Sequence, residues 1–209
     1  MNDINYKKKT IVRTIILLMC GMIVPISLMA QDMEWGIKGG INFSNLFIEQ
    51  TDDESARTGF HAGFYTKIPV ATNFAIQPEL MFNTKGADAE YASGQIDYNL
   101  NYIDVPVLAD FQLGPTADLL IGPYVGVLLG SVAEVDGNFG DELVEISRDD
   151  FAPVDFGFSA GFALNFNALS VGTRYSLGVV QVAKTETAET ILGSASNSLA
   201  QVYLSYRIR

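Results

Sequence analysis

Most of the chain alternates, position by position, between apolar residues and polar or small ones. In residues 154–166 the even positions hold Val, Phe, Phe, Ala, Phe, Leu and Phe, whereas the odd positions hold Asp, Gly, Ser, Gly, Ala and Asn. A period of two is typical of a β-strand with one apolar face, because successive side chains of a strand point to opposite sides. The period of 3.6 that an amphipathic helix requires is hard to find after Trp35.

The alternation predicts eight strands. Their ranges are 34–46, 57–68, 74–82, 96–111, 119–129, 154–166, 169–179 and 198–208. The apolar phase within 96–111 changes near Tyr102, which indicates a β-bulge. Short links are expected at 70–72, 113–116 and 166–168, and long links at 48–56, 86–94, 131–152 and 180–196. Links of alternating length are typical of outer-membrane barrels, which have tight periplasmic turns and longer outer loops.

The apolar faces could point inward, as in a secreted lipocalin-like binder, or outward into lipid. The interior of an eight-stranded barrel is just wide enough for side chains to fill, so it cannot hold all the large apolar groups of this chain. The opposite faces are rich in glycine, which makes room for long charged neighbours. We therefore predict an all-β fold: an eight-stranded antiparallel up-and-down transmembrane β-barrel with its polar face inward, four long outer loops and short periplasmic turns.

The first thirty residues have the layout of a secretory signal. Lys7, Lys8, Lys9 and Arg13 precede an apolar run over 15–26, and Ala30 offers a small residue for cleavage. The run is too short for a membrane span, which needs roughly 20 residues. The sequence thus predicts a signal peptide at 1–30, an outer-membrane β-barrel domain at 31–209, and a place in the bacterial outer membrane.

Charge and composition exclude several classes of partner. The net charge is −11, and removal of residues 1–30 takes away four basic residues and one acidic one, which leaves 9 basic against 23 acidic. Nucleic acid is not expected, because phosphate contacts need clusters of Lys and Arg. Cys20 lies in the predicted signal, and His61 is the one histidine. Neither a metal site nor a cofactor is therefore predicted.

Three stretches carry a family resemblance. The run from Trp35 to Leu46, WGIKGGINFSNL, resembles the opening strand of the PorT-like family of small outer-membrane β-barrel proteins. Residues 102–108, YIDVPVL, and 74–80, FAIQPEL, are similar to strands in the middle of those barrels. The resemblance implies a barrel over the whole mature chain and no shared catalytic residues. The ending from Tyr206 to Arg209 departs from the aromatic last residue common in such strands.

Charged residues on the inward faces are predicted to form a network in the lumen. They are Glu34, Lys38, Arg57, Lys67, Glu79, Asp104, Asp110, Asp118, Asp155, Arg174 and Arg207. Charges in so confined a space must pair, because an isolated buried ion costs several kcal/mol. The network could be a salt-bridged plug, which we favour, or it could form a selectivity lining or a proton path.

The predicted outer loops hold almost all of the net charge. They contain fifteen acidic residues and two basic ones, and the longest, 131–152, also contains scattered apolar residues. Its candidate partner-binding residues are Asp136, Phe139, Asp141, Glu142, Glu145, Asp149 and Asp150. A calcium site over 136–142 is an alternative, but Gly140 and Asp141 stand in the reverse order to a calcium-binding loop.

These features predict a non-enzymatic, monomeric barrel in contact with outer-membrane lipid, with a structural or interaction role and a possible protein partner at the outer loops. A narrow porin-like channel and a barrel subunit of a protein secretion assembly are the alternatives. A third hypothesis is a lipid-modifying enzyme in which His61 would act as base, with Ser44 or Ser159 as nucleophile.

Overall fold

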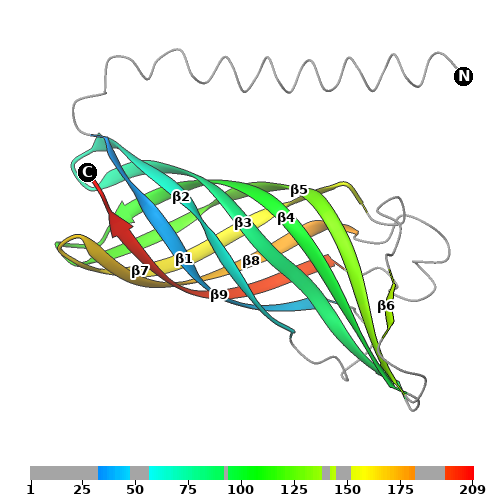
Figure 1. The fold of residues 1–209 in the computed structure, drawn as a ribbon. Coiled ribbons are helices and arrows are strands. Elements are labelled where there is room, and N and C mark those ends of the chain that lie inside the picture. Colours follow the sequence, from blue (N-terminus) through cyan, green and yellow to red (C-terminus); the bar gives the residue numbers. More distant parts are fainter. Residues whose placement is uncertain (1–32, 48–56, 92–93, 138–141, 145–151, 182–195) are drawn as a thin grey trace, which may run out of the picture. The chain divides into compact units, whose positions relative to one another are not determined.

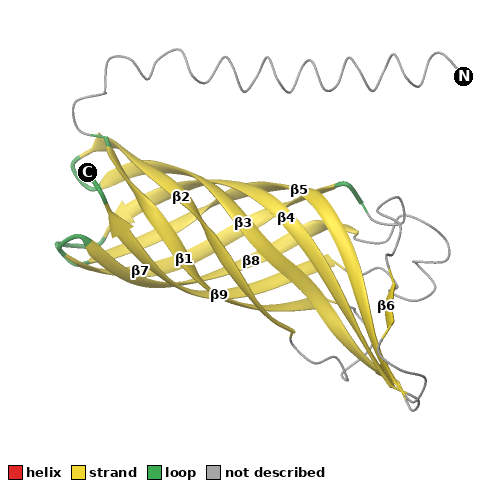
Figure 2. Cartoon of the chain, in the orientation of Figure 1, coloured by secondary structure: helices red, strands yellow, loops and turns green. Residues whose placement is uncertain are grey.

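The computed structural model describes residues 33–47, 57–91, 94–137, 142–144, 152–181 and 196–209. Within these ranges the chain forms nine β-strands (Figure 2). They are β1 (Glu34–Phe47), β2 (Arg57–Ala71), β3 (Phe74–Tyr91), β4 (Gly94–Gln112), β5 (Ala117–Gly137), β6 (Glu142–Val144), β7 (Val154–Phe166), β8 (Leu169–Gln181) and β9 (Ser196–Arg207). Among the described residues, no helix has the length and apolar character that a membrane crossing requires.

Eight of these strands close into an antiparallel barrel (Figure 1). The order around it is β1, β2, β3, β4, β5, β7, β8 and β9, and β9 pairs with β1 from Gly36↔Arg207 to Phe47↔Ser196. Within the closed part of the barrel every strand thus has two neighbours and no free edge, as a lipid environment requires. This closure confirms the predicted fold class. The short strand β6 pairs with β5 at Ala133–Val135, beyond the pairing of β5 with β7.

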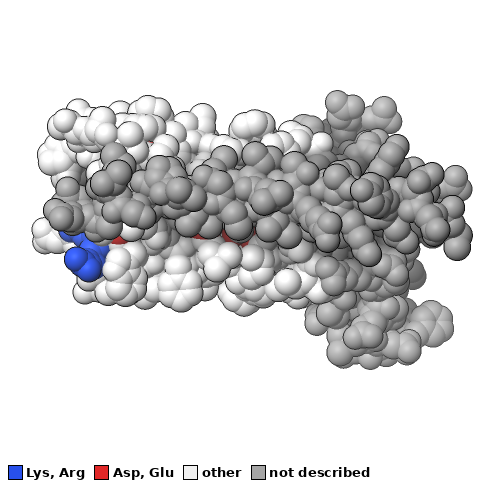
Figure 3. Space-filling view, turned by 90° about the horizontal axis from the view of Figure 1, so that it is seen from above, with Lys and Arg blue, Asp and Glu red and all other residues white. Residues whose placement is uncertain are grey.

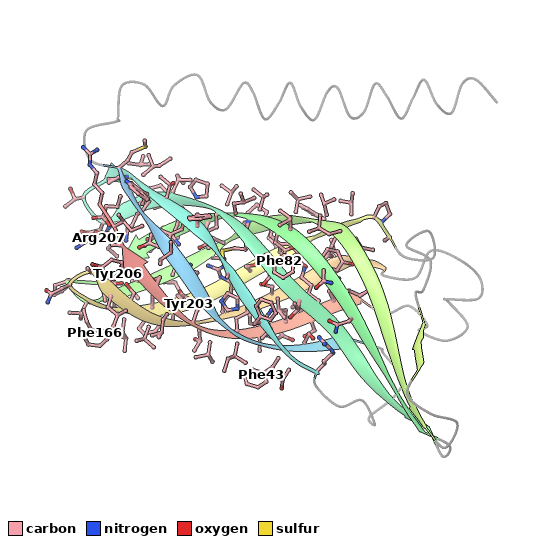
Figure 4. The ribbon with its side chains drawn as sticks, in the orientation of Figure 1. Phe43, Phe82, Phe166, Tyr203, Tyr206 and Arg207 are labelled. Atoms are coloured by element: carbon pink, nitrogen blue, oxygen red, sulfur yellow. The ribbon has the colours of Figure 1, made fainter. Side chains whose placement is uncertain are left out.

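Side chains alternate between the barrel interior and the outer wall, as predicted. In β5, Leu120 is 2% exposed, whereas its neighbours Leu119 and Ile121 are 41% and 49% exposed. Figure 4 shows Phe43 and Phe166 projecting from the wall. On the face shown in Figure 3 the described surface is mostly uncharged, with basic side chains gathered at one end and a few acidic atoms visible there and near the middle. The outer wall is therefore the apolar surface that lipid would contact.

The strand predictions are accurate to within about three residues at the short-turn end, where β2 extends into the link predicted at 70–72, and three of them are too short at the other end. The predicted range 154–166 matches β7, the short link 113–116 is the turn between β4 and β5, and the bulge appears as a register shift between Asn101 and Tyr102. The long links predicted at 86–94 and 131–152 are wrong in part, because β3, β4 and β5 continue into them. These three strands have 18, 19 and 21 residues, against 12 to 15 for the other barrel strands.

Glycine on the inward face makes room for interior tyrosines. A Cβ added to Gly172 would collide with the ring carbon Cζ and the hydroxyl of Tyr203, and one added to Gly157 would approach the ring of Tyr124. Both tyrosines are buried in the lumen. At these two positions a large interior ring therefore lies beside a neighbouring strand residue that carries no side chain.

Candidate functional site

The interior of the barrel carries ionised side chains at successive levels from the short-turn end. The first level is an exposed pair, which we call the rim pair. Arg207 Nη1 lies 2.9 Å from Glu34 Oε1, and the two side chains are 41% and 36% exposed. Arg207 also donates from Nη2 to the backbone carbonyl of Asn167, in the turn between β7 and β8. The rim pair therefore joins β1 and β9 to a short turn at the mouth of the barrel.

The second level is the lower triad, which consists of Lys67, Asp110 and Asp118. Lys67 Nζ lies 2.7 Å from Asp110 Oδ2 and 2.9 Å from Asp118 Oδ2. Asn165 also donates to Asp118 Oδ2, and Ser170 donates in turn to Asn165 Oδ1. With one cation and two carboxylates, the lower triad has a formal net charge of about −1 when all three groups are ionised.

The central triad of Lys38, Glu79 and Arg174 lies deeper. Arg174 donates to both carboxylate oxygens of Glu79 at 2.7 Å, and Lys38 Nζ lies 2.5 Å from Glu79 Oε1. The ammonium of Lys38 also stands 4.4 Å from the ring centroid of Tyr203. All three members of the triad are 5% exposed or less. Glu79 lies on β3 and Arg174 on β8, four places apart in the ring of eight, so this ion pair crosses the full width of the lumen.

A layer of uncharged side chains follows, made of Asn42, His61, Asn83 and Gln201. Gln201 donates to Asn42 Oδ1 and Asn83 Oδ1, at 2.9 and 3.0 Å. His61 Nδ1 lies 2.6 Å from Asn42 Oδ1, an oxygen that can only accept, so Nδ1 carries the proton. Ser44 donates to backbone carbonyls and Ser159 bonds to Ser176. The structure therefore brings neither serine to His61 as a hydrolase pair would require.

The upper triad contains a lysine that the sequence analysis missed. Lys85 Nζ lies 3.0 Å from Asp104 Oδ2 and 2.9 Å from Asp155 Oδ2, with its side chain 2% exposed. Its ammonium also stands 4.6 Å from the ring centroid of Tyr102 and 4.9 Å from that of Tyr124. Lys85 is in phase with Glu79, but the predicted strand stopped at residue 82. Continuing the alternation three residues further would have found it.

Ten of the eleven predicted lumen residues are members of the rim pair or of one of the triads. The eleventh, Arg57, begins β2 opposite Ser44 and is half-buried, on the same strand face as His61. With Lys85 added, the lumen has six basic and six acidic residues among those described. The charges within the barrel are therefore balanced, as burial in a low-dielectric space demands.

A polar cavity of about 400 Å³ opens at the short-turn end. The rim pair and the turn residues Gly114 and Asn167 line its mouth, while Lys38 and Tyr203 lie further along their strands at its inner end. In Figure 4, Arg207 lies at the end of the barrel and Tyr203 deeper along the same strand. The lumen is thus open to solvent for part of its length and filled by side chains at the central triad.

The opposite end of the barrel continues as a small sheet of β3, β4, β5 and β6. Asp88 pairs in register with Asp97, and Asp97 with Glu134, so three acidic positions lie side by side on adjacent strands. The sequence analysis placed Asp97 in a strand but treated Asp88 and Glu134 as loop residues, so it did not foresee this row.

Two of the candidate partner-binding residues fall in this sheet. Asp136 lies in β5 and Glu142 in β6, whereas Phe139, Asp141, Glu145, Asp149 and Asp150 lie outside the described residues. No group of three potential metal ligands is found within the described ranges, which exclude most of the segment considered for calcium.

Solved structures with a similar fold include bacterial outer-membrane proteins. The attachment invasion locus protein Ail of Yersinia pestis is 15% identical, with 85% of this chain and 100% of that chain covered and a TM-score of 0.48. Neisserial surface protein A is 11% identical over 83% and 96% of the two chains, with a TM-score of 0.44. OprG from Pseudomonas aeruginosa is 9% identical over 84% and 96%, with a TM-score of 0.38.

A comparison with curated proteins gave no significant match. The family model of the outer membrane protein beta-barrel domain matches residues 29–184, which is most of the chain. The closed antiparallel barrel and its apolar outer wall agree with that match. The chain therefore belongs to the family of outer membrane protein beta-barrel domains.

Proposed function

We propose that this protein is a sealed outer-membrane barrel with a structural or interaction role, and that it presents an acidic surface outside the cell. The observation that carries the proposal is the central triad. Its ion pair joins strands on opposite sides of the barrel, and its members are almost fully buried. A channel would need a continuous wet path through this level.

Several contacts hold the seal in place. Gln77 donates to Glu79 at 2.8 Å, and the ring of Tyr203 lies 5.7 Å from the guanidinium of Arg174 as well as beside Lys38. The uncharged layer and the upper triad add two further filled levels beyond it. Moving any of these charges aside would leave a partner ion unpaired in a low-dielectric space, which costs several kcal/mol. The triad therefore acts as a plug.

Planar-bilayer recording tests the seal. The purified wild-type barrel is expected to give no steady conductance, because no ion can pass the central triad without breaking it. A variant with both Glu79→Ala and Arg174→Ala opens the central level alone and is also expected to stay closed, because the uncharged layer and the upper triad remain filled. Steady single-channel steps from the wild-type protein would contradict the proposal.

The hypothesis of a lipid-modifying enzyme has little support in the geometry. His61 is 2% exposed, its Nδ1 is bonded to Asn42, and its place in the lumen keeps it from lipid. A role as a subunit of a secretion assembly, and membership of the PorT-like branch in particular, stay predictions from the sequence resemblance.

We further propose that the acidic end of the barrel docks a basic partner. The row formed by Asp88, Asp97 and Glu134 supports this proposal, because the strand register gathers three acidic positions on adjacent strands. Binding should weaken as salt screens the attraction. The partner is expected to co-purify with the barrel from gently solubilised membranes at low salt and to be lost at high salt. Recovery of the same partner at both salt concentrations would contradict an electrostatic interface.

We also propose that the protein is exported through a signal peptide that is then cleaved. Residues 1–30 contain the basic, apolar and small-residue regions of such a signal, and the family match starts close to its end, at residue 29. Mass spectrometry of the protein purified from outer membranes is expected to give a chain that begins at Gln31. Recovery of the full-length chain there would contradict cleavage.

A further inference from the structure

The polar cavity at the short-turn end has the character of a ligand site. Its volume of about 400 Å³ lies within the range of small-molecule pockets, roughly 300 to 1,000 Å³. Its mouth is at the end of the barrel that carries the tight turns, which is the periplasmic end in outer-membrane barrels. A small solute from the periplasm could therefore enter it without crossing the central triad.

Two clusters of opposite charge border this cavity. The central triad, which contributes Lys38 to the lining, has two cations and one carboxylate. The lower triad, which contributes Lys67 and Asp118, has one cation and two carboxylates. The inner end of the cavity thus has an excess of positive charge and its side wall an excess of negative charge. The rim pair adds one charge of each sign at the mouth.

Each cluster also offers an atom to a ligand. Lys38 has three ammonium donors, and its described hydrogen bond to Glu79 uses one of them. Both described hydrogen bonds of Asp118 end on Oδ2, which leaves Oδ1 to accept another donor. The two residues line the cavity and are only 5% and 7% exposed. They are therefore built into the wall, and are not mobile groups at the surface.

We propose that this cavity binds a small zwitterion, an α-amino acid or a short peptide, with the ligand carboxylate at Lys38 and its ammonium group at Asp118. A ligand with one charge would be attracted by one cluster and repelled by the other, whereas a zwitterion satisfies both. Hydrogen bonds with an ionised donor or acceptor are roughly twice as strong as those between neutral groups, so both ends of the ligand would contribute to affinity. This inference goes beyond the proposed function, since it requires the cavity and not the sealed lumen.

Calorimetric titration of the wild-type barrel in nanodiscs tests the ligand class. The probes are L-alanine and glycylglycine, and the controls are N-acetylglycine, which lacks the ammonium group, and glycinamide, which lacks the carboxylate. Saturable binding is expected for at least one of the zwitterions. Each capped probe is expected to bind about tenfold more weakly or worse, because it loses a hydrogen bond between charged groups.

Two matched variants test the assigned residues. Asp118→Asn removes the carboxylate of the cavity wall and leaves Lys67 paired with Asp110, whereas Asp104→Asn makes the same change in the upper triad, outside the cavity. Asp118→Asn is expected to weaken zwitterion binding by about tenfold, and Asp104→Asn to leave it within about twofold of wild type. Both variants are first checked for the compact gel mobility of a folded barrel.

Three results would overturn the proposal. They are the absence of saturable binding by either zwitterion, equal binding of the capped and uncapped probes, and equal effects of the two variants on affinity. The wild-type titrations decide the first two without any variant, so a folding defect in a variant cannot rescue the proposal.

Discussion

Replacing Glu79 by Gln is expected to destabilise the barrel more than replacing either of its cationic partners. Glu79 accepts hydrogen bonds from both Lys38 and Arg174. Glutamine keeps the size of the side chain but not its charge, so two cations remain side by side with no carboxylate. Removing one member of a buried ion pair costs about 3–5 kcal/mol when it leaves an uncompensated charge. We expect Glu79→Gln to lower the free energy of unfolding by that amount.

Arg174→Met is expected to cost less, about 2 kcal/mol. It leaves only Glu79 Oε2 without its described hydrogen bond, which is worth about 1.5–3 kcal/mol, because Oε1 keeps its bonds to Lys38 and Gln77. The remaining pair is electrically neutral, and the methionine side chain fills part of the vacated space. The order of the two effects therefore follows from the net charge that each change leaves behind.

The single tryptophan of the chain allows the unfolding of each variant to be followed by fluorescence. Trp35 lies in β1 on the outer wall and is 44% exposed, so its fluorescence reports whether the barrel is inserted in lipid. Urea unfolding of each variant in lipid vesicles gives the free energy of unfolding. Glu34→Gln in the rim pair is the matched control, because this ion pair is partly exposed and should contribute about 0–1 kcal/mol.

Two results would refute this reasoning. Equal costs for Glu79→Gln and Glu34→Gln would mean that the central triad is wet, and the proposed seal would fail with it. A larger cost for Arg174→Met than for Glu79→Gln would mean that packing or hydrogen-bond number, and not uncompensated charge, governs stability at this level.

Four further predictions concern other parts of the barrel. Lys85→Met should lower the free energy of unfolding by about 3–5 kcal/mol in the same urea assay, because it leaves two buried carboxylates without a cation. Gly172→Ala should lower the free energy of unfolding by about 1–3 kcal/mol, because the added methyl group collides with Tyr203, and a double variant that also carries Tyr203→Leu should recover part of that loss. Unboiled protein in detergent should migrate differently from boiled protein on a gel, and equal mobility would contradict a closed barrel. Replacement of residues 131–152 by a tight glycine-containing turn should preserve that mobility, since loop length changes closure entropy slowly, but should abolish co-purification of a basic partner.

The period-two pattern by itself determined the eight barrel strands, apart from the far ends of β3, β4 and β5, and which side chains share a face. Alternation needs only local geometry, because a strand places successive side chains on opposite sides wherever it lies. The change of phase at Tyr102 was visible for the same reason and corresponds to the register shift at that position. Composition added that the apolar face must point outward, since it is too large for the interior of eight strands.

The pattern could not determine which charges meet inside the barrel. Glu79 and Arg174 are 95 residues apart and meet because the closure and stagger of eight strands place β3 opposite β8. The same stagger puts Lys85 between carboxylates of β4 and β7 and forms the cavity between the central and lower triads. Alternation says that a side chain points inward, whereas its depth and its partner across the lumen depend on the register of every strand in between. That register is a property of the closed barrel, and only the tertiary structure decides it.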